Sequence, residues 1–323
     1  MLKQKIPQEA IEQIAIAAQL AILLEVSGYP KPGNIHRLHD FEDTKYEHFV
    51  ASGIAIGPLL KKIATQGAKV GLNLINPRQI GIGKLIKDCI KNANEWHHGR
   101  NTILGLAALI APLTAGAGIT LAKCGRMSLN QIRRNTAIVM RSSTVQDAID
   151  FYDAVKNAGP GGLKRSHAKD APNVHNVHAK KELKKKNLTL YDIMNDCASY
   201  DDICKEWTSN MNTTFKLGYP TLTRTFRKFR DINIATVHTF LTILSSRPDT
   251  LITRKTNLNT SLAICKEARN VLEKGGLTTV SGEKSLKKLD RNLRKRGNAL
   301  NPGTTADLTA ASLMVAILCG LRP

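Results

Sequence analysis

A long uncharged stretch near the middle of the chain limits what this sequence can fold into. No charged residue lies between Arg100 and Lys123, in TILGLAALIAPLTAGAGITLAK, which is long enough in principle to cross a bilayer. However, the stretch contains Pro112 and several glycines, is apolar largely through alanine, and lacks an aromatic belt apart from Trp96. We therefore expect a buried central helix whose small residues allow close packing, and no membrane segment.

The rest of the chain also shows a helical period. In residues 8–27, apolar side chains recur at spacings of three and four, and Gly28 and Pro30 supply a stop. Further helical runs follow at about 48–64, 145–158, 189–209, 232–245, 258–273, 283–295 and 304–319. Two-residue alternation is almost absent. The sequence therefore predicts an all-α fold: a single globular multi-helix domain over residues 1–323.

Threonines mark the expected starts of three of these helices. Thr44 and Glu47 form a capping-box pattern, and Thr144 with Asp147 forms another ahead of a helix that Gly159 ends. Thr102 can cap the uncharged helix.

Cysteine usage bears on the compartment. Six cysteines, Cys89, Cys124, Cys197, Cys204, Cys265 and Cys319, are scattered without C-x-x-C spacing. This pattern argues against a zinc site or a redox pair and favours reduced, buried thiols. No secretory leader pattern opens the sequence. A cytoplasmic protein is expected.

The formal net charge of +21 indicates a polyanionic partner, small polyphosphate substrates or a solvated basic surface. Much of the excess lies in runs at 178–187, 223–231 and 284–297, and such runs are usually solvated faces. Helix-turn-helix and zinc-finger signatures are absent. The phosphate-binding pattern G-x-x-x-x-G-K-[ST] is also missing, and GIGK at 81–84 is only a fragment of it.

The loop GYPKPGNIH at 28–36 follows the first apolar helix, which contains Glu25 near its end. Its prolines restrict the backbone, and Gly33 permits close approach of a ligand. The loop therefore presents Lys31, Asn34 and His36 with little entropy left to lose on binding, which suits an anion. The alternative is a plain helix-terminating turn.

An acidic segment follows directly, with Asp40, Glu42 and Asp43 within four positions. Loop carboxylates of this kind can hold Mg²⁺ when water and phosphate oxygens complete its coordination. Alternatively, these acids only cap the next helix.

Two further helix starts carry polar groups. Asn101 and Thr102 begin the uncharged helix, whose positive end favours phosphate, although a plain cap is equally compatible. In LNPGTTADLTAAS at 300–312, Asp307 lies in the first turn of an apolar helix and could serve as metal ligand or general base. Asp249 and Arg254 lie between two other helices and would reach a common cleft if these pack antiparallel.

These motifs occur in an order and spacing that resembles the triphosphoribosyl-dephospho-CoA synthase family over nearly the whole chain. The resemblance rests on E…PKPGN, the acidic loop, NT..G before a small-residue helix, and NPG..ADL near the C-terminus. It implies an all-helical enzyme that joins the ribose C1 of ATP to the 2′-hydroxyl of 3′-dephospho-CoA and releases adenine. The positions carried over by the motifs are Glu25, Lys31, Pro32, Gly33, Asn34, Asn101, Thr102, Gly105, Pro302, Gly303, Ala306 and Asp307.

Two departures from the bacterial pattern bear on the substrate. Bacterial members tend to carry Gly-x-His-x-Asp-Met where this chain has LHDFEDT, so Asp40 and Asp43 compete as the matching acid. Where they commonly show Asn-Thr-His-Lys-Gly, this chain has Ile103 and Leu104. The chain therefore resembles an archaeal-type branch, in which the acceptor can differ.

The hypothesis assigns each candidate residue a role. The catalytic candidates are Glu25 and Asp307, and Mg²⁺ is assigned to Asp40 or Asp43. Binding of ATP and its phosphates is assigned to Lys31, Gly33, Asn34, His36, Asn101, Thr102 and Arg254. The expected partners are ATP and a nucleotide-like or cofactor-precursor acceptor. Two rival hypotheses are a ribosyl or phosphoribosyl transferase with another acceptor in archaeal cofactor synthesis, and a basic helical nucleic-acid-binding protein.

Overall fold

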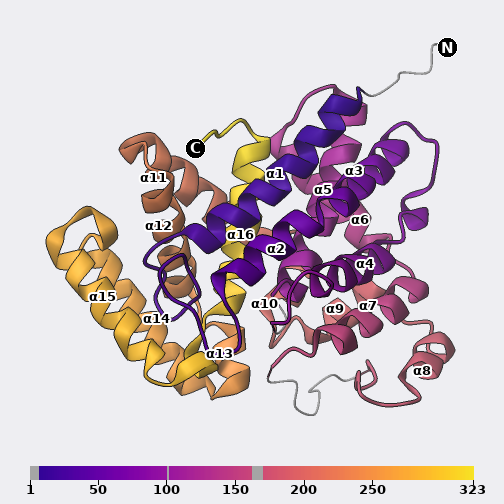
Figure 1. Cartoon of the computed structure of the whole chain (residues 1–323). Coiled ribbons are helices and arrows are strands. Elements are labelled where there is room, and N and C mark those ends of the chain that lie inside the picture. Colours follow the sequence, from indigo (N-terminus) through magenta and orange to yellow (C-terminus); the bar gives the residue numbers. More distant parts are fainter. Residues whose placement is uncertain (1–6, 100–101, 162–169) are drawn as a thin grey trace.

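The computed structural model describes residues 7–99, 102–161 and 170–323, and every regular element in these residues is helical (Figure 1). Two isolated bridges, His36 with His39 and Phe41 with Thr44, are the only β-type pairing within these residues. The all-α prediction is confirmed. The division of the chain into domains stays a prediction.

The N-terminal half forms the body of the molecule around one central helix. Its elements are α1 (Gln8–Ser27), α2 (Tyr46–Ala55), α3 (Gly57–Gly71), η1 (Pro77–Gln79), α4 (Ile82–Asn94), α5 (Leu104–Cys124), α6 (Leu129–Arg141) and α7 (Val145–Ala158).

The C-terminal half crosses back to this body and then extends from it. Its elements are α8 (Ala179–Lys185), α9 (Leu190–Cys197), α10 (Asp202–Thr208), η2 (Thr214–Gly218), α11 (Tyr219–Phe229), α12 (Ile232–Ser246), α13 (Thr250–Lys255), α14 (Leu258–Glu273), η3 (Gly276–Thr278), α15 (Val280–Arg294), η4 (Gly297–Leu300) and α16 (Gly303–Leu318).

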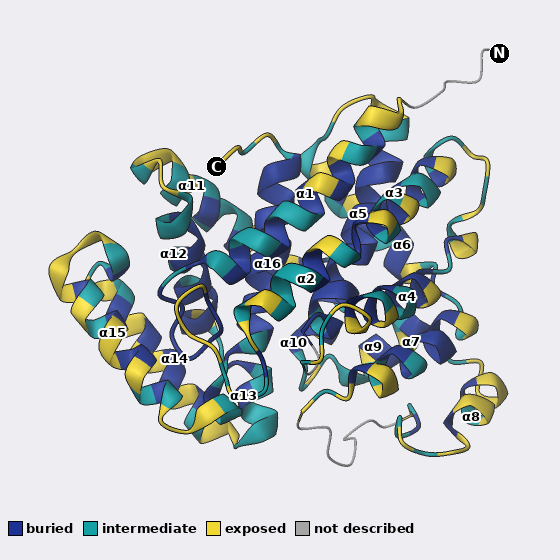
Figure 2. Ribbon diagram, viewed as in Figure 1, coloured by how far each residue is buried: buried dark blue, intermediate teal, exposed yellow. Residues whose placement is uncertain are grey.

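Helix α5 is the buried centre predicted from the uncharged stretch (Figure 2). Glycines let its neighbours approach at backbone distance: a Cβ at Gly118 would lie 2.2 Å from the Ala64 carbonyl oxygen of α3. A Cβ at Gly116 would lie 2.3 Å from Thr136 Oγ1 of α6. Both α1 and α5 are long and apolar enough to span a membrane, but 83% of the apolar α5 segment is buried inside the protein. Close helix packing therefore explains its composition.

A second, smaller core lies between α12, α14 and α15, where Phe240, Leu244, Val271 and Leu289 are buried. Figures 1 and 2 show these helices beside the body, with α16 passing between the two parts. The junction brings together α1 and α16, and the loop after α1 reaches α15 through Gly33 and Asn34.

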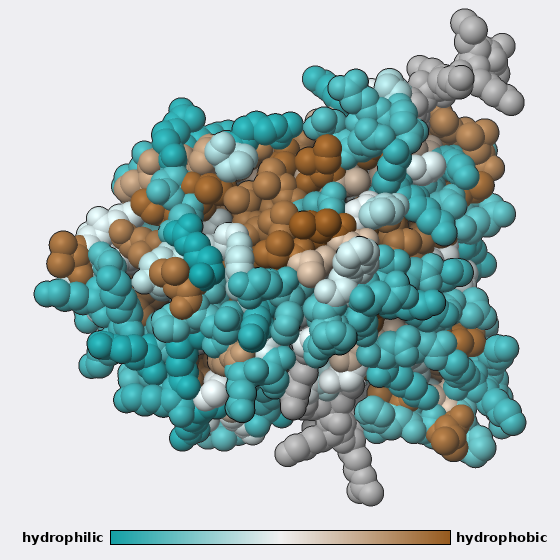
Figure 3. Space-filling model, in the orientation of Figure 1, coloured by the Kyte–Doolittle hydropathy of each residue, from teal (hydrophilic) through white to brown (hydrophobic). Residues whose placement is uncertain are grey.

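The face of the molecule in Figure 3 is largely polar. Figure 3 shows one apolar band on this face, over α1 and α2, where Ile16 is 51% and Ile54 is 58% exposed. Hydrophilic side chains cover most of the remainder of the view.

Two of the three predicted threonine caps are wrong. Helix α2 begins at Tyr46, beyond Thr44, and Thr44 Oγ1 donates to the Asp43 carboxylate instead. Helix α5 begins at Leu104 after Ile103, so Thr102 lies outside its first turn. The third cap is confirmed: Thr144 Oγ1 accepts from the Asp147 amide at 3.2 Å, and the Asp147 carboxylate accepts from the Thr144 amide at 2.7 Å.

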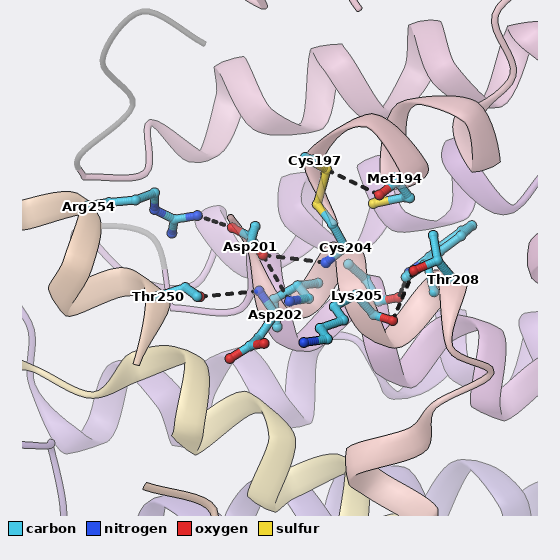
Figure 4. Close-up of a disulfide and its surroundings, with 12 residues drawn as sticks. Met194, Cys197, Asp201, Asp202, Cys204, Lys205, Thr208, Thr250 and Arg254 are labelled. Carbon is cyan, nitrogen blue, oxygen red and sulfur yellow. Dashed lines mark hydrogen bonds and ion pairs between the residues drawn. A yellow bond between two sulfur atoms is a disulfide. The ribbon is translucent and has the colours of Figure 1, made fainter. Parts of the chain in front are cut away.

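The cysteine prediction also needs correction. Cys197 and Cys204 form a disulfide, and Cys124 is exposed, whereas Cys89 and Cys265 are buried free thiols (Figure 4). The disulfide joins the end of α9 to α10, where a single helix over 189–209 was expected. A cytoplasmic location stays a prediction, although the disulfide weakens the reasoning on which it rested.

Candidate functional site

The start of the loop at 28–36 is fixed to α12, one of the helices of the second core. The Tyr29 amide donates to Asn233 Oδ1 at 2.7 Å, and Asn233 Nδ2 donates back to the Tyr29 carbonyl at 2.6 Å. A Cβ at Gly28 would lie 2.9 Å from Thr236 Cγ2, so α12 contacts the loop directly. The loop is therefore part of the packed structure.

Lys31 turns inward and forms an ion pair with Glu25 at the end of α1. Lys31 is fully buried and Glu25 is 7% exposed. Burial lowers the pKa of Lys31 and raises that of Glu25, and each partner's charge opposes the other's shift. In this structure the Lys31 ammonium is engaged with Glu25 and shielded from solvent, and phosphate binding by Lys31 stays a prediction.

Gly33 contacts protein where the sequence suggested a ligand. It has φ +70°, its amide donates to Asp290 Oδ1 at 2.8 Å, and a Cβ there would lie 2.7 Å from Leu293 Cβ. Gly33 therefore lets the loop approach α15. Asn34 is similarly held, with Nδ2 donating to Asn301 Oδ1 at 2.7 Å.

His36 is buried beside Arg294, and its Nε2 lies 3.0 Å from Arg294 Nη2. Burial, and then the charges of Arg294, Lys31 and His39, lower the pKa of His36 to about 3. His36 is therefore neutral at physiological pH, and offers its partners a ring nitrogen without charge.

Asp307 links two motifs that lie far apart in sequence. A Cβ at Gly105 would lie 2.1 Å from Asp307 Oδ2, so the carboxylate of α16 rests on the first turn of α5. Burial raises the pKa of Asp307 well above its ordinary value, and the charges of Glu25 and Asp249 add to the effect. Asp307 also acts electrostatically on Lys31. We call Glu25, Lys31 and Asp307 the site cluster.

Asp249 fixes the start of α16, from which Asp307 projects. It is 1% exposed, and its Oδ1 accepts from the amides of Leu251 and Ile252 at the start of α13. Its Oδ2 accepts from the amide and the hydroxyl of Thr305, both at 2.8 Å. One carboxylate thus caps two helices.

The double cap predicts a measurable cost when Asp249 is replaced by alanine. We expect the free energy of unfolding to fall by about 1–4 kcal/mol, twice the roughly 0.5–2 kcal/mol that losing one cap costs. Asp231→Ala is the matched control because Asp231 caps α12 alone, with Oδ1 accepting from the Ile234 amide at 2.8 Å. Urea denaturation measures both, and equal losses would contradict the double role.

Arg254 lies on α13 and forms an ion pair with Asp201 (Figure 4). Asp201 lies within the loop that the disulfide closes, and its Oδ1 also accepts from the Ile203 amide at 2.8 Å. The charges of Arg254 and Asp201 both act on Asp307. The common cleft expected for Asp249 and Arg254 stays a prediction.

The remaining predicted residues lie around this centre. Thr102 is 8% exposed and shares a 2.7 Å hydrogen bond with Ser52 of α2, whereas Asn101 lies outside the described residues. Asp40 is exposed, with Oδ1 accepting from the Tyr46 amide at 2.8 Å, and Asp43 is half-buried. Phe41, between these two acids, carries Arg294 over its ring at 5.8 Å.

The donor chemistry of Asp40 and Asp43 suits Mg²⁺, which commonly takes one or two protein carboxylates and substrate phosphates. Within the described part of the chain, no three His, Cys, Asp or Glu side chains gather to hold a metal by themselves.

Sequence reasoning missed Asp290 and Arg294, because the run at 284–297 was interpreted as a solvated face. Arg294 Nε donates to Asp290 Oδ1 at 2.8 Å, and Nη2 donates to the Asn34 carbonyl at 2.6 Å. A signal was present: Asp290 and Arg294 follow the buried Leu286 at helical spacing and share its face.

Comparisons with known proteins show which family the chain belongs to. The family described as ATP:dephospho-CoA triphosphoribosyl transferase matches residues 11–322. A relative from Klebsiella pneumoniae, named 2-(5''-triphosphoribosyl)-3'-dephosphocoenzyme-A synthase, is 23% identical over 305 residues, covering 93% of this chain and 89% of the relative. A Salmonella typhimurium protein assigned to the same synthase is 23% identical, covering 90% of this chain and 86% of that protein.

A solved structure from Archaeoglobus fulgidus, assigned as a triphosphoribosyl-dephospho-CoA synthase, has the same fold. It aligns with a TM-score of 0.62 at 19% identity, covering 84% of this chain and 100% of the solved chain. Because the family match spans nearly the entire sequence, this chain belongs to the ATP:dephospho-CoA triphosphoribosyl transferase family, a family of transferase enzymes.

Proposed function

We propose that this chain transfers the 5-triphosphoribosyl group of ATP to the 2′-hydroxyl of 3′-dephospho-CoA and releases adenine. Family membership supports the reaction type. The observation that supports the proposal is the contact between Asp307 and Gly105, which joins the last motif to the second, while Asp307 interacts electrostatically with Lys31 and Glu25.

Asp307 is the residue best placed to accept the proton of the acceptor hydroxyl. It is only half-buried, so a substrate can reach it, and its raised pKa makes it a stronger base than an ordinary carboxylate. Glu25 is committed to Lys31 and serves to hold that pair. We therefore assign the role of general base to Asp307 alone, although the sequence offered both Glu25 and Asp307 as candidates.

The surrounding cations would hold the triphosphate and balance charge as adenine departs. Lys31 contributes through its fixed position, and Arg254 contributes a guanidinium beside Asp307. Mg²⁺, bound with help from Asp40 or Asp43, would neutralise part of the phosphate charge. Lys31 and Arg254 are each already fixed by a carboxylate partner, which reduces the reorganisation that the reaction requires.

The raised pKa of Asp307 predicts an unusual acid limb for turnover. The base must be ionised, so kcat should fall as the pH is lowered through this pKa, at a pH above the ordinary carboxylate range near 4. The same shift makes the folded chain bind this proton more tightly than the unfolded chain, so the contribution of Asp307 to stability decreases as pH rises. A pH profile of kcat that stays flat down to about pH 4 would contradict this role.

The proposed reaction is tested by incubating the purified chain with ATP, Mg²⁺ and 3′-dephospho-CoA. Chromatography should show free adenine, and mass spectrometry should show the triphosphoribosyl adduct. Adenine released only with a different hydroxyl acceptor would favour the rival transferase. Absence of adenine, together with salt-sensitive RNA binding that survives Asp307→Asn, would favour the nucleic-acid reading.

A further inference from the structure

Buried polar atoms without a partner gather at this site. In the described residues, four buried side-chain polar atoms have no hydrogen-bond partner: Thr136 Oγ1, Thr236 Oγ1, Arg254 Nε and Arg294 Nη1. Thr136 lies elsewhere, against Gly116 in the α5–α6 contact. The other three belong to residues that contact the loop at 28–36 or act electrostatically on the site cluster.

Arg294 has an orientation that protein contacts fix without using all of its donors. Asp290 holds Nε, and the Asn34 carbonyl and His36 hold Nη2. Nη1 has no hydrogen-bond partner. The Arg294 side chain as a whole is 16% exposed, so it lies close to the molecular surface.

Arg254 has the same arrangement on the other side of the α16 start. Asp201 holds Nη1, Nε is left over, and the side chain is 26% exposed. Lys255, its neighbour, donates to the carbonyl of Asn298 in η4 at 2.9 Å. Asn298 Oδ1 accepts from Asn301, which in turn accepts from Asn34, so a hydrogen-bond chain joins the two arginine sites.

An unsatisfied buried N–H costs about 1–3 kcal/mol, and native proteins rarely retain one without a reason. An anion that supplies the missing acceptor would remove this cost. Guanidinium groups already oriented by carboxylates lose little freedom when they bind phosphate. The neighbouring Lys31 adds a further positive charge.

We propose that Arg294 and Arg254 are two arms of a polyphosphate-binding site, with Arg294 Nη1 and Arg254 Nε donating to phosphate oxygens. This inference rests on the proposed function and adds Arg294 as a substrate-binding residue. Lys31 then supports the site electrostatically, while the two arginines make the contacts.

Isothermal titration of the full chain with inorganic triphosphate tests the inference. We expect Arg294→Gln and Arg254→Gln each to weaken binding at least tenfold. Arg291→Gln is the matched control: it removes the same charge from an exposed position on α15 and should change the affinity less than twofold. Equal affinities for Arg294→Gln and Arg291→Gln, or no binding by the wild-type chain, would overturn the proposal.

A second variant covers the case in which Arg294→Gln fails to fold. Arg294→Lys keeps the charge and one donor but loses the planar fork, so triphosphate should bind at least fivefold more weakly. Wild-type affinity in this variant would refute the role of Nη1. If arginine-dependent binding is found but no adenine is released with any hydroxyl acceptor, the transferase reaction fails while the anion site stands.

Discussion

Asp307→Asn should lower kcat by about 10²–10⁴-fold, the usual contribution of a general base. The substitution keeps the size of the side chain and removes only its ability to accept a proton. Because Asp307 is half-buried and rests on Gly105, asparagine fits the same place. Steady-state rates of adenine release measure the effect, and the affinity for inorganic triphosphate should change little.

Two companion variants separate loss of the base from a general disturbance. Asp88→Asn removes a carboxylate whose partner is the exposed Lys84, and should leave kcat within twofold. Gly105→Ala should lower kcat as strongly as Asp307→Asn, because the added Cβ would displace the Asp307 carboxylate. Alanine otherwise favours a helix by up to about 1 kcal/mol, so lost helix propensity cannot explain such a loss. Full activity of Asp307→Asn would remove the assignment.

Lys31→Met should lower the free energy of unfolding by about 3–5 kcal/mol, the usual effect of leaving one half of a buried ion pair without its partner. Glu25 would then stand alone at 7% exposure, and it would take up a proton to avoid an uncompensated charge. Its folded-state pKa would rise further, so the variant should become more stable as pH falls toward the raised pKa. Urea denaturation at several pH values measures both effects.

The double variant Glu25→Gln/Lys31→Met is the control for this prediction. It removes both charges, so much of the lost stability should return, whereas turnover should stay low because the fixed positive charge is absent. A surface pair offers the contrast: Lys84→Met should cost no more than about 1 kcal/mol. If Lys31→Met lowers the free energy of unfolding as little as Lys84→Met does, the Glu25–Lys31 pair does not stabilise the site.

Much of this fold could be predicted from residues whose effect is local. The uncharged run correctly predicted the buried α5, and Thr144 with Asp147 correctly predicted the start of α7. Both predictions succeeded because each signal acts within a single helix. The failed predictions involve side-chain contacts that replace the expected ones. Thr44 was expected to cap α2, but the Asp43 carboxylate takes its hydroxyl, and the Cys197–Cys204 disulfide accompanies a break in the helix expected at 189–209.

Part of the candidate site could be predicted from the motifs, whereas Asp290 and Arg294 could not. Glu25, Lys31 and Asp307 do act on one another, as the motif order suggested. Nothing in the local sequence indicates that the Gly33 amide faces Asp290 or that the Asn34 carbonyl accepts from Arg294, because both contacts depend on α15, which lies some 260 residues further on. Arg294 was missed because its basic neighbours made the run at 284–297 resemble a solvated face.

The most direct test of the account is a crystal structure of the chain with ATP and Mg²⁺. We expect the phosphate chain to lie between Asp307 and Arg294, with phosphate oxygens within hydrogen-bond distance of Arg294 Nη1 and Arg254 Nε. A nucleotide bound instead along α6, where Arg133, Arg134 and Arg141 line a surface cavity of about 480 Å³, would contradict it.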